Sequence, residues 1–177
     1  MGTPAVERHA PRSFAQDALA LVALLGSVAG AAWMVPFSSW GDFVDPAARQ
    51  GPLILLLVPV LLLLRRGGTA GASYEKRLLC VVLAAMPLVY LESGVIHGAG
   101  KWLALEAVGL LVFAAWAWLG YRRDPWVLAL GLAAHGITWD SWHHGSHYIA
   151  SWYAVACLII DLGLAAYVVL QRDRYLS

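Results

Sequence analysis

Six long runs of apolar residues constrain this chain more than any other feature of its sequence. Crossing about 30 Å of hydrocarbon takes roughly 20 residues of helix at about 1.5 Å per residue. Lipid offers no partner to a free backbone N–H or C=O, so such runs are typical of transmembrane helices and exclude an open sheet. The sequence therefore predicts an all-α, six-helix transmembrane bundle in one domain over 1–177, with helices at residues 15–36, 51–64, 78–97, 102–120, 125–143 and 148–171.

Composition agrees with a bilayer environment. Hydrophobic residues make up 60% of the chain and charged residues 13%, which excludes a soluble enzyme, a disordered tail and a disulfide-rich secreted module. The net charge of +1 gives no indication of nucleic acid, so the expected partner is the lipid bilayer, and the oligomeric state stays open. Cys80 and Cys157 lie inside apolar runs and are expected to be buried thiols. Glu7 precedes the first run, which favours a retained helix over a cleaved signal peptide.

The distribution of basic residues predicts the orientation of the bundle. Lys and Arg concentrate in the short cytoplasmic loops of membrane proteins. Arg49 and Lys101 are predicted on the outer side, whereas the other ten basic residues share the opposite side: Arg8, Arg12, Arg65, Arg66, Lys76, Arg77, Arg122, Arg123, Arg172 and Arg174. Both termini are therefore predicted to be cytoplasmic, and the loops at 37–50, 98–101 and 144–148 are predicted to face outward.

This orientation sets the depth of each polar side chain in the membrane. Two polar residues, His135 and Asp161, are expected near the midplane, and nothing comparable is expected in the cytoplasmic half. The others gather in the outer third or at the outer helix ends: Glu92, Ser93, His97, Glu106, Asp140, His143, His144 and His147. An ionised side chain at the bilayer centre costs about 2.5–3.5 kcal/mol on insertion scales, so the carboxylates need partners such as imidazoles, protons or metal ions.

The densest polar stretch runs from residue 135 to residue 147. At 100° per residue, one helical face presents Asp140, His143, His144 and His147. Helical spacings of three and four residues are typical of zinc and iron ligands, so these histidines are candidate metal ligands and Asp140 a candidate catalytic residue. If Gly145 ends the helix, the ligands come from two helices instead. The alternative role for each histidine is a hydrogen-bonding anchor at the membrane surface.

A second group of polar residues lies around His97. Ser93 and His97 are one helical turn apart, Glu92 is adjacent to Ser93, and Glu106 follows on the next predicted helix. A serine or carboxylate beside a metal-bound histidine can polarise water or stabilise an oxyanion, so Ser93, Glu92 and Glu106 are candidate catalytic residues and His97 a candidate ligand. The alternative for Ser93 is a hydrogen bond back to the carbonyl of Val89.

His135 and Asp161 are expected to touch. They fall at similar depth on antiparallel helices joined by a short turn, and a lone carboxylate there needs a partner. Both residues are candidate metal ligands, and a structural pair is the equally weighted alternative.

The pattern His135-Gly-x-x-Trp-Asp140-x-x-His143-His144, with Glu106 before it and Asp161 after it, resembles a group of small, uncharacterised bacterial polytopic membrane proteins. The resemblance covers about the last 80 residues and implies the inner membrane of a bacterium. A more distant likeness is to the transmembrane metal hydrolases that include alkaline ceramidases and the progestin and adipoQ receptors. It implies a zinc site at Ser93, His97, His143 and His147, although that family has seven helices, a later histidine pair and an aspartate where Glu106 stands.

Two classes of function follow from these residues. The first is a metal-dependent enzyme at the outer leaflet, a zinc hydrolase or an iron oxidase acting on a lipidic substrate. The second is a metal or proton transporter, in which His135 and Asp161 continue the outer cluster towards the midplane. A haem protein, with His97 and His144 as axial ligands, is a further alternative. The sequence leaves open which of these the chain is, and therefore whether it is an enzyme.

Overall fold

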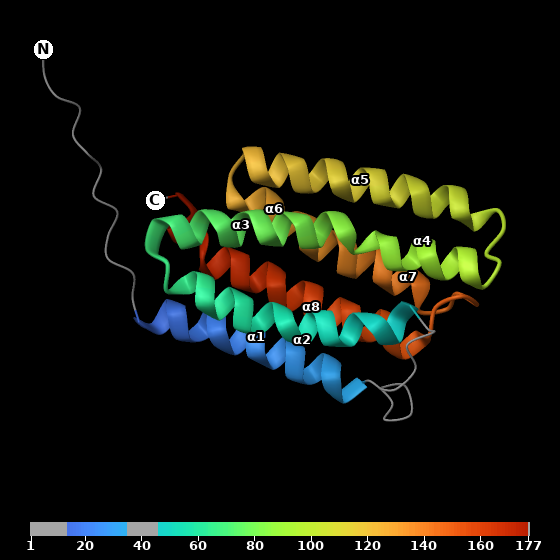
Figure 1. Ribbon diagram of the computed structural model, residues 1–177, viewed down its shortest axis with the longest axis horizontal. Helices are drawn as coiled ribbons and strands as arrows, with labels where there is room; N and C mark the ends of the chain where they lie inside the picture. The colour runs from blue at the N-terminus through green and yellow to red at the C-terminus, as the bar shows by residue number, and fades with distance from the viewer. Residues whose placement is uncertain (1–13, 35–45, 177) are drawn as a thin grey trace, which may run out of the picture.

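The computed structural model describes residues 14–34 and 46–176, with residues 46–55 described by their backbone alone. Every regular element in these ranges is a helix, and the long helices run side by side along one axis (Figure 1). The order is α1 Phe14–Met34, α2 Pro46–Arg65, α3 Gly68–Ala85, α4 Pro87–Ile96, α5 Trp102–Arg122, α6 Pro125–Ala134, the π-helix η2 His135–Asp140, α7 Ser141–His143, α8 Ser151–Leu170 and α9 Arg172–Leu176.

Four helical segments are long and apolar enough to cross a membrane: α1, the α3–α4 segment Gly68–Ile96, α5 and α8. The described part of α2, Leu56–Arg65, is a shorter apolar helix. The described residues therefore form an all-helical fold with spans suited to a membrane, which agrees with the class predicted from the sequence.

Three of the predicted helices differ most from the structure, in where they begin or in whether they are continuous. The helix predicted at 78–97 begins ten residues earlier, at Gly68, and divides at Pro87, which has no N–H to donate. The helix predicted at 51–64 begins at Pro46, so α2 has 20 residues, the length that a membrane span needs. The helix predicted at 125–143 is not continuous α-helix, because η2 separates α6 from α7.

The basic residues gather at one end of the bundle, which we call the basic end. The N-terminus of α1, the C-terminus of α8 and the α5–α6 turn all lie there (Figure 1). Ion pairs join these segments: Arg65 Nη2 lies 2.9 Å from Asp17 Oδ1, and Arg172 Nη2 lies 2.7 Å from Asp124 Oδ2. The opposite end, which we call the His-rich end, carries the α4–α5 turn and the segment between α7 and α8.

Small residues let α1 and α8 pack closely. A Cβ added to Gly163 would lie 2.1 Å from the Ser27 hydroxyl oxygen, so only glycine fits there. Ser27 donates its hydroxyl to the carbonyl of Leu24 at 2.9 Å, which satisfies it inside the interface. Contacts of this kind drive helix association in lipid, where the hydrophobic effect between helices is lost.

A buried carboxylate in the basic half corrects the expectation that this half lacks polar groups. Glu75 of α3 is fully buried and forms an ion pair with Arg174 of α9. Its Oε1 accepts hydrogen bonds from the hydroxyls of Tyr167, at 2.8 Å, and Tyr175, at 2.5 Å. Arg174 also donates to the carbonyl of Leu64. The network therefore ties the C-terminal helices to α2 and α3, which is a structural role.

Candidate functional site

The π-helix η2 brings His135 and Asp140 to the same side of the chain. In an α-helix, residues five apart lie about 140° from each other, because each residue advances about 100°. A π-helix closes hydrogen bonds between residues five apart, which stacks them, and such turns occur often at functional sites. The backbone N–H of Ser141 bonds the carbonyl of Gly136 in this way, and Thr138 Oγ1 donates to the carbonyl of Ala134 at 2.6 Å.

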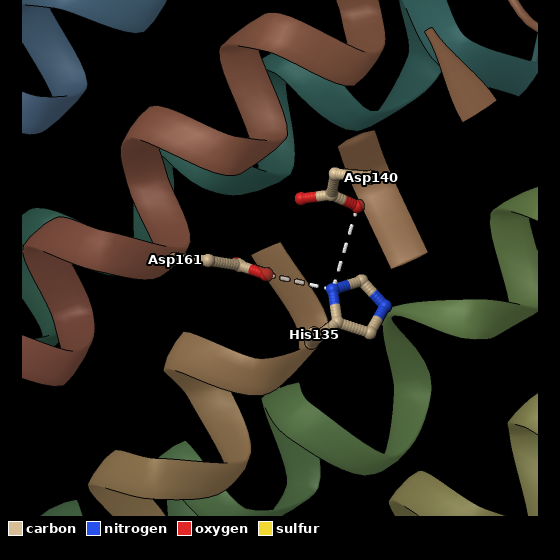
Figure 2. Close-up of side chains that lie close together, drawn as sticks. All are labelled: His135, Asp140 and Asp161. Atoms are coloured by element: carbon tan, nitrogen blue, oxygen red, sulfur yellow. Dashed lines mark hydrogen bonds and ion pairs between the residues drawn. The ribbon is translucent and has the colours of Figure 1, made fainter. Parts of the chain in front are cut away.

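Three buried side chains meet at this π-helix (Figure 2). His135 Nδ1 lies 2.6 Å from Asp161 Oδ2 on α8 and 3.5 Å from Asp140 Oδ1. The predicted contact between His135 and Asp161 is thus confirmed, and Asp140 joins it from the same helix as His135. We call His135, Asp140 and Asp161 the deep cluster.

The deep cluster carries an excess of acidic groups. Two carboxylates share one imidazole, so the three groups together are negative unless a further proton or a metal ion joins them. His135 Nε2 and Asp140 Oδ2 are buried without a hydrogen-bond partner among the described residues. Burying such polar atoms without a partner is costly, so in native folds they commonly bind an ion or a water molecule.

One nitrogen or oxygen atom from each of the three residues lies within 4.8 Å of the other two. Imidazole nitrogen and carboxylate oxygen are ligands for zinc, iron and manganese. By ligand type and spacing, the cluster is a candidate metal site.

A pocket of about 350 Å³ adjoins the deep cluster. Its polar lining comes from Tyr90, His135, Tyr153, Cys157 and Asp161, and its remaining walls are apolar residues of α2, α3, α4 and α8. The cluster therefore lies beside a space that can admit an apolar molecule.

A second buried cluster lies nearer the His-rich end. Glu106 of α5 and His143 of α7 are both fully buried, and His143 Nε2 lies 2.9 Å from Glu106 Oε1. The hydroxyl of Tyr148 donates to the same oxygen at 2.5 Å. His143 Nδ1 lies 2.7 Å from the carbonyl of Trp139, which can only accept, so Nδ1 carries a proton. A further proton is shared between Nε2 and Glu106.

Tyr90 of α4 links the two clusters. Its hydroxyl donates to Asp140 Oδ1 at 2.5 Å, and its ring centroid lies 4.0 Å from that of His143. A buried chain of polar side chains therefore extends from Asp161 to Tyr148, and it involves residues of α8, η2, α4, α7 and α5.

Other predicted site residues do not join these clusters. His143 is buried, whereas His144 and His147 are exposed, so the predicted shared face of three histidines is not formed. The reason is local: α7 ends at His143, and a non-helical segment follows before α8. The alternative prediction, a helix end at Gly145, lies close to the observed end at His143. It does not bring the predicted ligands together, because His144 and His147 lie at the surface.

The group around His97 is also rearranged. Ser93 donates to the carbonyl of Tyr148 at 2.5 Å rather than to Val89, and its Oγ lies 3.2 Å from His97 Nδ1. His97 and Glu92 are exposed at the surface. Ser93 therefore anchors the backbone of the segment that carries Tyr148.

Tyrosines are the site residues that sequence reasoning missed. Tyr90, Tyr148 and Tyr153 are buried beside the clusters, but tyrosines in apolar helices also occur as interfacial anchors, so their sequence positions carry no distinct signal. The sequence signal that could have identified Tyr90 is its predicted depth in the membrane, because it lies one turn before Ser93 on the same predicted helix.

Comparison of the chain with models of protein families, with curated proteins and with solved structures finds no match. The resemblances drawn from the sequence motifs therefore stay predictions, and the functional argument depends on the geometry of the clusters and the pocket.

Proposed function

We propose that the chain crosses a bacterial inner membrane six times, with both termini in the cytoplasm. Two further segments, α2 and the run α6–η2–α7, lie beside the four candidate spans (Figure 1). Basic residues at one end of the bundle support this orientation, because Lys and Arg favour cytoplasmic loops.

We propose that the protein is a metal-dependent membrane enzyme in which the deep cluster holds a transition-metal ion, zinc or iron. The observation that carries the proposal is three buried ligand atoms, from His135, Asp140 and Asp161, within 4.8 Å of one another beside an apolar pocket. Three protein ligands with one position left for water or substrate are typical of catalytic zinc.

The distances within the deep cluster test the fit of an ion. Ligand atoms about 2.0–2.2 Å from a tetrahedral ion lie roughly 3.3–3.6 Å apart. The 3.5 Å separation of His135 Nδ1 from Asp140 Oδ1 meets this condition. The 2.6 Å separation from Asp161 Oδ2 is that of a hydrogen bond, so binding requires the Asp161 oxygen to move outward by about 1 Å.

The bound ion would activate a water for hydrolysis of an ester or amide, or, if it is iron, would support an oxidation. The residues of the chain then have separate tasks. Tyr90 fixes the Asp140 carboxylate through its hydroxyl, and the apolar walls of the pocket exclude bulk water and admit a lipidic substrate.

Metal analysis of the purified protein tests this proposal. We expect about one zinc or iron ion per chain after loading, and a decrease of at least about tenfold in Asp161→Asn and in Asp140→Asn. Occupancy should also fall below about pH 6, because the ligands bind metal in their deprotonated forms.

The exposed histidines provide the matched control. A variant with His97, His144 and His147 all changed to alanine should keep its metal, because none of the three belongs to the deep cluster. Metal lost from this triple variant but kept by Asp161→Asn would reject the deep cluster as the site.

The alternative is a proton or cation transporter, and one observation favours it: the buried polar chain from Asp161 through His135, Asp140 and Tyr90 towards Glu106. Towards the basic end, however, the buried residues beyond Asp161 include Leu79, Leu83 and Leu164. A path through the bundle must cross this apolar core. Proton flux into liposomes that Asp161→Asn abolishes, in protein free of metal, would favour the transporter.

A further inference from the structure

The pocket beside the deep cluster opens on the flank of the bundle. Leu56 and Val60 of α2 and Val81 and Ala85 of α3 line the pocket and are also exposed on the surface. All four are apolar, and in a bilayer this flank lies against acyl chains. A ligand can therefore enter between α2 and α3 from the lipid.

The size of the pocket suits one hydrocarbon chain. Its lining extends on α8 from Tyr153 to Leu164, which is about 16 Å at about 1.5 Å per residue. Its volume of about 350 Å³ is at the lower end of the roughly 300–1,000 Å³ that is usual for ligand sites. A long space of small volume is narrow, so a single chain fits better than a two-chain lipid.

The polar wall of the pocket selects the head of the ligand. Tyr90, His135, Tyr153 and Asp161 present hydroxyl, imidazole and carboxylate groups, and the described lining contains no lysine or arginine. An anionic head finds no cationic partner in this lining, whereas the hydroxyl, imidazole and carboxyl groups can form hydrogen bonds with a hydroxyl or amide.

We propose that this pocket binds a single-chain amphiphile with an uncharged, hydrogen-bonding head, such as a long-chain alcohol or amide. The head meets His135 and Asp161, and the chain lies along the apolar walls towards the opening between α2 and α3. The inference rests on the proposed function in one respect, that this ligand is related to the substrate. A long-chain alcohol is a product of ester hydrolysis, and a long-chain amide is itself a hydrolysable substrate.

Photolabelling of the protein in lipid nanodiscs tests the proposal. The probe is a long-chain alcohol with a diazirine in its chain, and mass spectrometry locates the adducts. We expect adducts on pocket-lining residues of α2, α3 and α8, and competition by unlabelled alcohol but not by the corresponding alkyl phosphate.

Tryptophan variants at and beside the opening provide matched controls. Val60→Trp and Ala85→Trp block the opening and should lower labelling by about tenfold. Leu63 of α2 and Leu88 of α4 are exposed about one turn away, outside the pocket lining, so Leu63→Trp and Leu88→Trp should leave labelling unchanged. Equal labelling of blocking and control variants, adducts confined to the outer surface of the bundle, or equal competition by the alkyl phosphate would overturn the proposal.

Metal content measured on the same samples separates the two proposals. Labelling that persists in protein shown to bind no metal would reject the metal-dependent function and support the pocket. Metal retained without labelling of the pocket would reject the pocket and leave the metal site standing.

Discussion

His143 lies between two oxygen partners, the backbone carbonyl of Trp139 and the carboxyl group of Glu106. The Trp139 carbonyl bonds Nδ1, and Glu106 bonds Nε2. The second Glu106 oxygen is buried without a hydrogen-bond partner among the residues described. A buried pair of this kind is costly to break, because removing one partner leaves the other desolvated and unpaired.

We predict that Glu106→Gln lowers the free energy of unfolding by about 1–3 kcal/mol, because an amide oxygen accepts weaker hydrogen bonds than a carboxylate oxygen does. Denaturant unfolding in detergent micelles provides the measurement. Asp173→Asn makes the same chemical change at an exposed ion pair and should cost less than about 1 kcal/mol. Equal costs in the two variants would contradict a buried pair.

At the scale of the elements, η2 packs closely against α8 beside the deep cluster. A Cβ added to Gly136 would lie 2.9 Å from Asp161 Cβ and 3.2 Å from Leu158 Cδ1. Real side chains do not pack at the shorter distance, so the absence of a side chain at Gly136 allows His135 to reach Asp161.

Gly136→Ala should therefore separate η2 from α8, with a cost of about 1–3 kcal/mol in unfolding free energy and loss of metal. Gly26→Ala is the control, since a Cβ on Gly26 of α1 meets no described atom within 4 Å. There the added methyl should be neutral or stabilise the helix by up to about 1 kcal/mol. Both effects are measured by unfolding, and a Gly136→Ala protein as stable as Gly26→Ala would show that the packing is not tight.

Asp124 caps α6 at the basic end and gives a pH-dependent prediction. It accepts hydrogen bonds from Arg172 and from the backbone N–H of Trp126, and these interactions, Arg172 first, lower the pKa of Asp124. A lowered pKa means that the carboxylate stabilises the fold fully above its ordinary value of about 3.9 and loses this effect as the pH falls through the lowered value.

Asp124→Ala should cost about 1 kcal/mol near pH 7, mostly through the lost cap, because the Arg172 pair is more than a third exposed. The difference between wild type and variant should shrink as the pH falls through the lowered pKa of Asp124. Thermal unfolding across this pH range checks the prediction, and a difference that grows in acid would contradict it.

On the scale of the whole molecule, the two ends of the bundle differ in charge. The basic end joins its helices through ion pairs at Asp17, Glu75 and Asp124, whereas the described part of the His-rich end has Lys101 as its exposed cation near α5. Charge asymmetry of this kind orients membrane proteins, because Lys and Arg concentrate in cytoplasmic loops, and it is the basis of the proposed orientation.

In a background with Cys80 and Cys157 changed to alanine, we expect Lys101→Cys to react with a membrane-impermeant maleimide on intact cells and Arg122→Cys not to react. Both positions are exposed and lie at opposite ends of α5. Permeabilised cells, in which both should react, provide the control. The reverse pattern would move the His-rich end to the cytoplasm.

The sequence by itself determined the helical class, the gathering of basic residues at one end and the contact of His135 with Asp161. The reason is that each depends on local or one-dimensional quantities: the length of an apolar run, the charge of a loop, and the depth of a residue along its helix. The free thiols of Cys80 and Cys157 follow from the same apolar runs.

Tertiary structure alone decided which polar residues share a site. The π-helix turned Asp140 towards His135, where a constant 100° per residue pointed it to His143 and His144. Tyr90 reached Asp140 from 50 residues away, and Glu106 captured His143. These partners depend on how helices rotate and pack about one another, and rotation is set by close contacts such as Gly136 against Asp161, which no pattern within a single helix records.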